Sequence, residues 1–182
     1  SFSNLDTSKL YYFYWVFSNF RYFERIQAKI KEIYQFPEIS DERNKMYKRM
    51  IEESKSISIH VRRGDYVKAG IETTDLSFYQ QAIDIIKSKV TNPKFFIFTD
   101  DIEFSKSLFK NAEFIYIEGN NGKDSYRDMQ LMSLCKHNIT ANSSFSFWGA
   151  FLNKNLEKIV ISPNLPFTGC ECPFVCPDWI VL

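Results

Sequence analysis

Short apolar runs alternate with amphipathic stretches along most of this 182-residue chain. Residues 56–61 alternate small polar side chains with branched apolar ones, and residues 95–98 are apolar throughout. Both patterns are typical of strands in a covered sheet. Between these runs, apolar side chains recur at helical spacing from Tyr79 to Ile86, and we expect Ser77 to cap that helix.

The same order of strand and helix continues toward the end of the chain. The strands that we expect are 56–61, 95–98, 114–117, 138–141 and 158–162, and further helices are expected over about 102–109, 125–136 and 143–152. Strands that alternate with helices in short units favour a mostly parallel sheet. The predicted fold class is therefore α/β, a Rossmann-like sheet with helices on both faces.

The first 55 residues follow a different pattern. They begin with many aromatic residues and continue with Ile26, Ile30 and Ile33 at helical spacing, a run that Pro37 ends. A second helix, polar in composition, is expected over residues 41–54. The sequence therefore predicts an aromatic-rich helical N-terminal segment, 1–55, followed by a Rossmann-like domain, 56–182.

Composition and charge exclude several classes of protein. A formal net charge of +1 and a pI near 7.6 argue against a nucleic-acid-binding protein, which would show a basic excess. Residues 10–23 are too few and too polar to span a bilayer, and no secretory signal pattern opens the sequence. The cysteine-containing tail, C-x-C-x-x-x-C, lacks the usual spacing of a zinc site, so we expect reduced thiols in a cytoplasmic protein.

Polar side chains gather directly after the predicted strands. Arg62, Arg63 and Asp65 follow the first strand, residues 100–101 follow the second, and residues 142–144 follow the fourth. Parallel sheets bind ligands at the carboxyl ends of their strands. The residues capable of chemistry are thus predicted to lie where such a fold places its site.

Residues 60–66 (HVRRGDY) place two adjacent arginines at the end of a strand. Because neighbouring side chains point to opposite sides, one arginine is free to face a ligand while the other pairs with protein. A guanidinium suits a diphosphate since its planar fork donates to two oxygens together. Two interpretations stay open here, phosphate binding and a purely structural pairing of Arg63 with Asp65.

Residues 141–146 (ANSSFS) join the fourth strand to a helix. Exposed backbone N–H groups at a helix start, with hydroxyls beside them, form an anion site, although simple capping by Ser143 or Ser144 explains the same residues. Asp128 has two interpretations as well. It is either a partner of a helix dipole or a carboxylate that accepts two N–H bonds from guanine.

The sequence favours no bound metal. Asp100 and Asp101 are adjacent, whereas a metal held with a nucleotide requires the spaced D-x-D pattern, and the 101–103 pair is a weak signal. His60 and His137 are the only histidines. A lone histidine on a strand, as His60 is, is more often a hydrogen-bonded structural residue than a base.

Together these residues resemble a known family. HVRRGDY resembles the H-x-R-R-x-D-Y signature of the α-1,2-fucosyltransferases, the bacterial-type, GDP-fucose-dependent members of glycosyltransferase family 11. FFIFTDDIEF resembles the second block of that family, and DSYRDMQLMSLCKHNITANSSFSFWGAFLN resembles its third block. The resemblance covers nearly the whole chain, but the Gly-rich G-G-L-G-N-Q segment that usually opens the family is absent.

The resemblance implies a function for each candidate residue. It implies the donor half of a two-domain GT-B fold that transfers L-fucose from GDP-fucose to a galactoside hydroxyl, in α-1,2 linkage, with inversion and without a metal. Arg62 would hold the β-phosphate with support from Arg63. The diphosphate would be cradled by Ser143, Ser144 and Phe145, beside Asn142. The guanosine would lie near His60 and Asp128.

The catalytic residues expected are Arg62 and a carboxylate base, Asp65, with Glu72 in reserve. The acceptor implied is a galactose-containing oligosaccharide or lipopolysaccharide, and the location implied is cytoplasmic, peripheral to the inner membrane. Two alternatives stay open. The chain is either a non-catalytic GDP-sugar-binding module that needs a partner segment, or a transferase of a different GDP-sugar.

Overall fold

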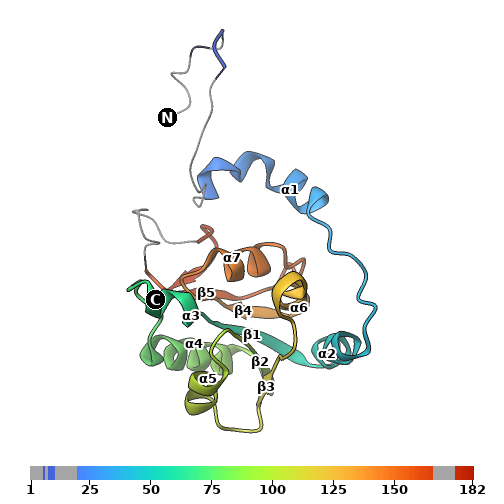
Figure 1. The fold of residues 1–182 in the computed structure, drawn as a ribbon, viewed down its shortest axis with the longest axis vertical. Helices are drawn as coiled ribbons and strands as arrows, with labels where there is room; N and C mark the ends of the chain where they lie inside the picture. The colour runs from blue at the N-terminus through green and yellow to red at the C-terminus, as the bar shows by residue number, and fades with distance from the viewer. Residues whose placement is uncertain (1–5, 7, 11–19, 166–174) are drawn as a thin grey trace.

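A six-stranded parallel sheet forms the centre of the molecule (Figure 1). The computed structural model describes residues 6, 8–10, 20–165 and 175–182. In that part of the chain the strand order is β3-β2-β1-β4-β5-β6, and every neighbouring pair is parallel. The strands are β1 (Lys55–Val61), β2 (Pro93–Thr99), β3 (Phe114–Tyr116), β4 (His137–Ile139), β5 (Val160–Ser162) and β6 (Ile180–Val181). This order is that of the Rossmann fold, and it confirms the predicted class and all five predicted strands.

Helices follow most of the strands, as the sequence predicted. They are α1 (Gln27–Ile33), α2 (Glu42–Glu52), α3 (Gly64–Lys68), α4 (Leu76–Lys89), α5 (Ile102–Leu108), α6 (Tyr126–Leu134) and α7 (Ser144–Phe151), with 3₁₀ turns η2 (Phe20–Tyr22), η3 (Glu24–Ile26) and η4 (Gly122–Asp124). Among the α-helices and strands two were not predicted, the five-residue α3 and the two-residue β6. The cap expected at Ser77 was wrong, because Asp75 accepts from the backbone N–H of Phe78 and α4 begins two residues earlier.

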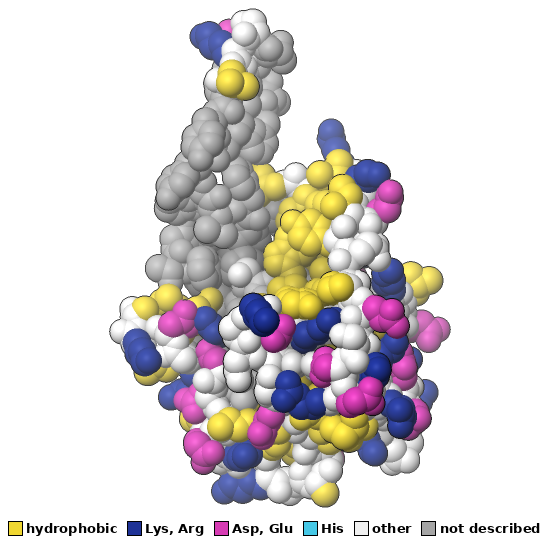
Figure 2. Space-filling model, turned by 45° about the vertical axis from the view of Figure 1, so that its right-hand side comes forward, with side chains coloured by type: hydrophobic (Ala, Val, Ile, Leu, Met, Phe, Trp, Pro, Cys, Tyr) yellow, Lys and Arg dark blue, Asp and Glu magenta, His cyan; other side chains and the backbone are white. Residues whose placement is uncertain are grey.

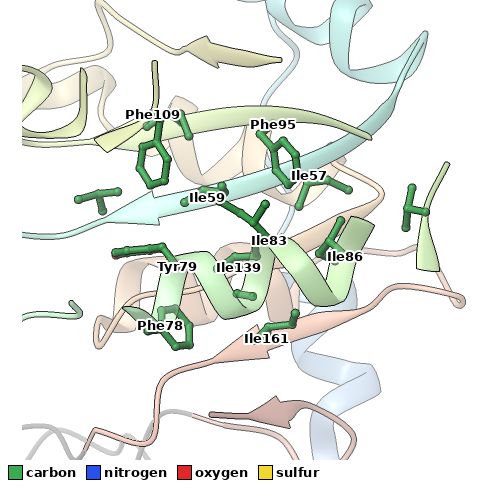
Figure 3. Packing of buried hydrophobic residues seen from close by; sticks show 14 residues of the cluster. Ile57, Ile59, Phe78, Tyr79, Ile83, Ile86, Phe95, Phe109, Ile139 and Ile161 are labelled. Carbon is green, nitrogen blue, oxygen red and sulfur yellow. The ribbon is translucent and has the colours of Figure 1, made fainter. Parts of the chain in front are cut away.

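The sheet separates two hydrophobic layers. On one face α4 and α5 cover the odd-numbered residues of β1, Ile57, Ile59 and Val61, all nearly inaccessible to solvent (Figure 3). On the other face α2 and α6 pack against the even-numbered Phe96 and Phe98 of β2. The alternation along each strand therefore sends one set of side chains into each layer.

The small polar residues of β1 are buried on the second face. Ser58 accepts a hydrogen bond of 2.7 Å from Asn138 of β4, and Asn153 donates to the Oδ1 atom of Asn138 at 2.8 Å. Because these buried amides and hydroxyls satisfy one another, their desolvation is compensated.

The predicted N-terminal segment contributes directly to this core. Ile51 of α2 is fully buried among residues of β2 and α6. Phe20 and Phe23 pack against Phe151 of α7 with ring centroids 6.4 and 5.4 Å apart, and Phe23 also stacks on Trp148. Residues 20–52 thus form a layer on the helices that cover the second face, and α2 reaches the sheet itself.

Part of α1 remains exposed. Ile26, Ile33 and Tyr34 are each more than half accessible to solvent, and Figure 2 shows hydrophobic side chains gathered on the part of the surface where α1 lies. In the part of the chain that the structure describes, Cys135 and Cys176 are buried free thiols, and no helix is long and apolar enough to cross a membrane. Cys170, Cys172 and most of the aromatic stretch 10–23 lie outside the described residues.

Candidate functional site

A cleft opens at the carboxyl ends of β1 and β4, where the strand order changes direction. β1 pairs with β2 on one side and with β4 on the other, which makes this crevice the topological switch point of the sheet. The cleft has a volume of about 310 Å³. Its lining residues come from the ends of β1 and β2, the loop after β3, the helices α3 and α6, and the start of α7: His60, Arg62, Tyr66, Phe98, Thr99, Asp100, Asn120, Ser125, Asp128, Met132, Ser143, Ser144 and Phe145.

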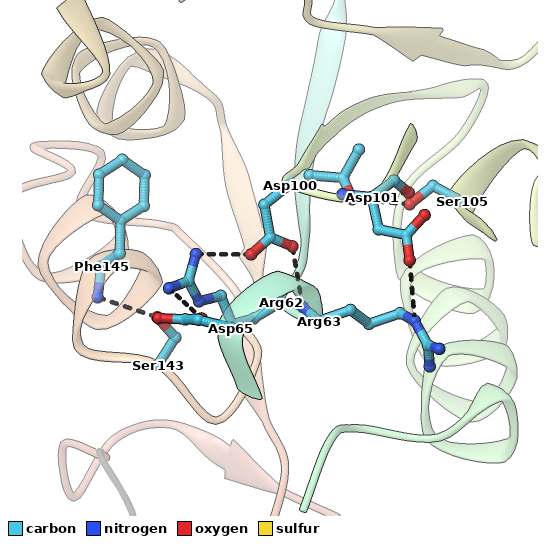
Figure 4. Close-up of polar contacts among 9 residues, drawn as sticks. Arg62, Arg63, Asp65, Asp100, Asp101, Ser105, Ser143 and Phe145 are labelled. Carbon is cyan, nitrogen blue, oxygen red and sulfur yellow. Dashed lines mark hydrogen bonds and ion pairs between the residues drawn. The ribbon is translucent and has the colours of Figure 1, made fainter. Parts of the chain in front are cut away.

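The two adjacent arginines extend in opposite directions (Figure 4). The Arg62 guanidinium points toward the start of α7 and pairs with Asp100 and Asp65, each at 2.6 Å. Arg63 instead pairs with Asp101 at 3.2 Å and lies 3.7 Å from the centroid of the Phe104 ring. Arg62 lines the cleft, whereas the partners of the Arg63 side chain lie on the other side, at the start of α5.

Asp65 is a partner of Arg62 and not of Arg63, which corrects the structural alternative considered for it. Its side chain is 68% exposed, and it is not among the residues that line the cleft. Glu72 lies at a neighbouring hollow of about 230 Å³, near the start of α4 and the end of β5. Both carboxylates are therefore exposed to solvent.

The start of α7 forms the opposite wall of the cleft. Ser143 caps the helix, because its hydroxyl accepts from the backbone N–H of Phe145 at 3.3 Å. Ser144 is exposed at the first helical position. Asn142 is buried one residue earlier, and its backbone N–H donates to Thr74 at 3.4 Å. Residues 143–145 thus face the cleft, while Asn142 lies behind them.

His60 forms part of the floor beside Phe145, with ring centroids 5.7 Å apart. Burial lowers the pKa of His60 to about 4, and the nearby Arg62 acts in the same direction against Asp100. The imidazole is therefore neutral near pH 7. No group in the described part of the chain bonds to its Nδ1 atom, so His60 offers a polar atom at the cleft floor and not a positive charge.

Asp128 contributes a second unusual group, from the first turn of α6. Burial raises the pKa of its carboxyl to about 6, although a 2.8 Å hydrogen bond from Asn120 and the positive charge of Arg43 act against that shift. Within the described part of the chain, no hydrogen bond reaches its second oxygen, Oδ2. The carboxyl is thus an acceptor at the cleft wall with capacity left for a ligand.

Sequence reasoning missed several lining residues. Asp100 was placed among the polar residues that follow the strands, but it was given no binding role, and its pairing with Arg62 was not predicted. Asn120 follows β3 in a Gly-rich loop, and Tyr66 lies within the unpredicted α3. Metal-binding clusters of three or more His, Cys, Asp or Glu side chains are absent among the described residues.

Residues 1–181 match the sequence model of one family, Glycosyl transferase family 11. The chain belongs to glycosyl transferase family 11. An alpha-1,2-colitosyltransferase of Escherichia coli is similar to this family 11 chain, with 36% identity over 157 residues that cover 80% of the chain and 52% of that protein. The O-antigen biosynthesis glycosyltransferase WbnK of Escherichia coli is 38% identical over 134 residues, which cover 68% and 43%.

A more distant relative of this family 11 chain is the galactoside 2-alpha-L-fucosyltransferase Sec1 of Mus musculus, 26% identical over 68% of the chain and 37% of that protein. Among solved structures, NodZ alpha-1,6-fucosyltransferase soaked with GDP-fucose has a TM-score of 0.42 at 18% identity, over 72% of this chain and 59% of that one. The chain spans about half the length of the curated relatives that it matches.

Proposed function

We propose that this chain binds the donor of a glycosyl transfer, GDP-fucose, in the cleft between β1 and β4, and serves the transfer of L-fucose to a galactoside hydroxyl in α-1,2 linkage with inversion. One observation carries the proposal. Arg62 and the amide-rich start of α7, which come from distant parts of the sequence, line the same cleft at the switch point of the sheet. Family membership supports glycosyl transfer as the reaction class.

The diphosphate would lie between Arg62 and residues 143–145. Asp100 and Asp65 hold the Arg62 guanidinium in one orientation, so its remaining donors are positioned before a ligand arrives. The N–H groups at the start of α7 add partial positive charge. As the bond to the anomeric carbon breaks, negative charge develops on the leaving GDP, and both groups stabilise it.

The guanine base would lie against His60 and Phe145 and be recognised by Asp128. A carboxylate accepts the N1–H and 2-amino donors of guanine, and adenine offers no such pair. The neutral imidazole suits a base-binding wall, because it places no extra charge beside the purine. This arrangement leaves the sugar toward the exposed mouth of the cleft. Asp65, which pairs with Arg62, and Glu72, in the neighbouring hollow, are candidates for the base that accepts the proton of the acceptor hydroxyl.

Calorimetry on the Arg62→Ala variant tests the proposal. Charge-assisted hydrogen bonds to the phosphate are lost, so GDP affinity should fall about ten- to hundredfold. Arg63→Ala is the matched control, since it removes the neighbouring guanidinium whose partners lie outside the cleft, and it should bind GDP as the native chain does. Equal GDP affinity in Arg62→Ala and the native chain would contradict the assignment.

We propose further that donor binding needs no metal, because Arg62 and the N–H groups of α7 neutralise the diphosphate. GDP affinity measured with and without a large excess of EDTA should then agree within about twofold, a difference that is small on the free-energy scale. A loss of binding in EDTA that Mg²⁺ or Mn²⁺ restores would show that a cation completes the site.

The identity of the donor sugar has a second candidate. The similarity to an alpha-1,2-colitosyltransferase favours a different GDP-linked sugar in the same cleft. Competition between GDP-fucose and GDP-mannose for the native chain separates the sugar contribution from that of GDP. The acceptor, a galactose-containing oligosaccharide or lipopolysaccharide, and a cytoplasmic location near the inner membrane stay predictions.

A further inference from the structure

A chain of side-chain amides connects the N-terminus of α2 to Asp128 at the wall of the cleft. Asn44 of α2 donates through Nδ2 to Oδ1 of Asn120 at 2.8 Å, and Asn120 donates through its own Nδ2 to Oδ1 of Asn44 at 2.9 Å. The same Nδ2 atom of Asn120 also donates to Asp128 at 2.8 Å. Both asparagines are nearly inaccessible to solvent, at 2% and 7% exposure.

Asp41 fixes the donor and acceptor direction of this series of hydrogen bonds at its other end. Its two carboxylate oxygens accept from Nδ2 of Asn44 at 3.1 and 3.0 Å, and one of them also accepts the backbone N–H of Asn44 at 2.9 Å. Because a carboxylate only accepts, Asn44 must present its NH₂ group there. The reciprocal amide pair then forces Asn120 to present its NH₂ group to Asp128.

Asn120 is held in place by its loop as well. Arg43 donates to the backbone carbonyl of Gly119 at 2.8 Å, and Gly119 has a φ of 93°, in the left-handed region that favours glycine. A Cβ atom at that position would collide with the Arg43 side chain. The loop therefore docks on α2 through both the backbone of residue 119 and the side chain of residue 120.

We propose that Asn44 and Asn120 are positioning residues for nucleobase specificity: they hold Asp128 so that its carboxylate accepts both guanine donors. This inference rests on the proposed assignment of Asp128 to the base. It makes α2, which the sequence placed in a separate N-terminal segment, part of the machinery that selects the nucleotide. The donor from Asn120 occupies Oδ1 and favours the ionised carboxyl, which leaves acceptor capacity on both oxygens for the ligand.

Comparison of GDP with inosine diphosphate, which lacks the 2-amino group, measures this recognition directly. Both ligands carry the same diphosphate, so the titration of the phosphates cancels in the ratio of their affinities. In the native chain we expect GDP to bind about tenfold or more tightly than inosine diphosphate at pH 7.5, the effect of one hydrogen bond to a charged group. The preference should decline as the pH falls through about 6 and Asp128 becomes protonated.

Other charged groups near Asp128 are not expected to produce that decline. Arg43 faces it from α2 and stays positive over this range, and Arg62 likewise keeps its charge at the cleft. Asp100 is paired with Arg62 across the cleft, and His60 is neutral down to about pH 4. The pH dependence of the GDP preference therefore reports on Asp128.

Two variants test the proposal, Asn44→Ala and the size-preserving Asn120→Asp. Each should reduce the GDP preference at pH 7.5 to about threefold or less and move its midpoint to higher pH, because the carboxyl loses a donor that favours ionisation. Asn121→Ala is the control, since Asn121 is an exposed neighbour in the same loop, and it should match the native chain. Thermal melting establishes that each variant is folded.

Several outcomes would overturn the proposal. If either folded variant keeps the native ratio and midpoint, Asn44 and Asn120 do not position Asp128. If Asn121→Ala changes the ratio as much as they do, the loop acts through general order and not through these contacts. Should the native chain bind GDP and inosine diphosphate equally at every pH, the assignment of Asp128 to guanine fails, and with it this part of the proposed function.

Discussion

At the scale of single residues, the opposite directions of the Arg62 and Arg63 side chains follow from strand geometry. Successive residues at a strand end point to opposite sides, so the sequence predicted correctly that the two would separate. The carboxylate partners could not be predicted, because Asp100 and Asp101 follow a different strand and meet the arginines only in the folded sheet. Pairing of Arg62 with Asp65, three residues later, is the one local contact among them.

Two buried titratable groups in the cleft act on stability in opposite directions. His60 has a pKa of about 4 against 6.5 when unfolded, so the unfolded chain binds more protons and stability is lost as the pH falls from about 6.5 to 4. Asp128 has a pKa of about 6 against 3.8, so the folded chain binds more protons and stability is gained as the pH falls from about 6 to 3.8. Between pH 4 and 6 the two largely cancel.

If one of these groups is removed, the effect of the other on the pH dependence of stability should become measurable. In Asp128→Asn the opposing gain is absent, so unfolding free energy should decline toward pH 4 more steeply than in the native chain, by up to about 1.4 kcal/mol per pH unit. Urea unfolding at several pH values between 4 and 7 measures the slope. A parallel profile for variant and native chain would show that the Asp128 carboxyl titrates alike in both states.

At the scale of elements, the crossing of α6 and α7 sets the width of the cleft. α6 carries Asp128 in its first turn, and α7 presents residues 143–145 at its start. The helices approach closely at Gly149, where an added Cβ would lie 2.9 Å from the Cβ of Met132. Sequence periodicity located both helices but not this contact, because packing distance depends on pairs of residues from different elements.

The Gly149→Ala variant should therefore loosen this crossing. Overpacking against Met132 exceeds the gain in helix propensity, so we expect a loss of about 1 to 2 kcal/mol in unfolding free energy and weaker GDP binding. Adding Met132→Gly removes the opposing Cβ atom and makes room for the new methyl group. In a double-mutant cycle the two losses should then be less than additive, whereas additive losses would show that the helices do not meet at this pair.

At the scale of the whole molecule, the sheet was the most predictable feature and the strand order the least. Alternating strands and helices indicated parallel pairing, but the positions of β4 and β6 depend on contacts far apart in sequence. The sequence predicted 1–55 as a helical segment before the Rossmann-like domain, and it did not predict that Ile51 of α2 is buried beside the sheet. The polar composition of α2 concealed this burial, because only one narrow stripe of the helix is buried: Asn44, Tyr47 and Ile51.

The length of the chain relative to its family relatives affects whether it can catalyse the proposed transfer by itself. It spans about half the length of its curated family relatives, and the carboxylate proposed as base, Asp65, is 68% exposed. A base in open water gains little from desolvation. We therefore predict that the chain alone binds GDP-fucose but does not transfer fucose at a measurable rate to a fluorescent terminal galactoside.

The same chain joined to the remaining part of a family 11 relative should form product that chromatography detects. Product from the chain alone, abolished by Arg62→Ala, would instead show that all the groups needed for transfer lie within these 182 residues.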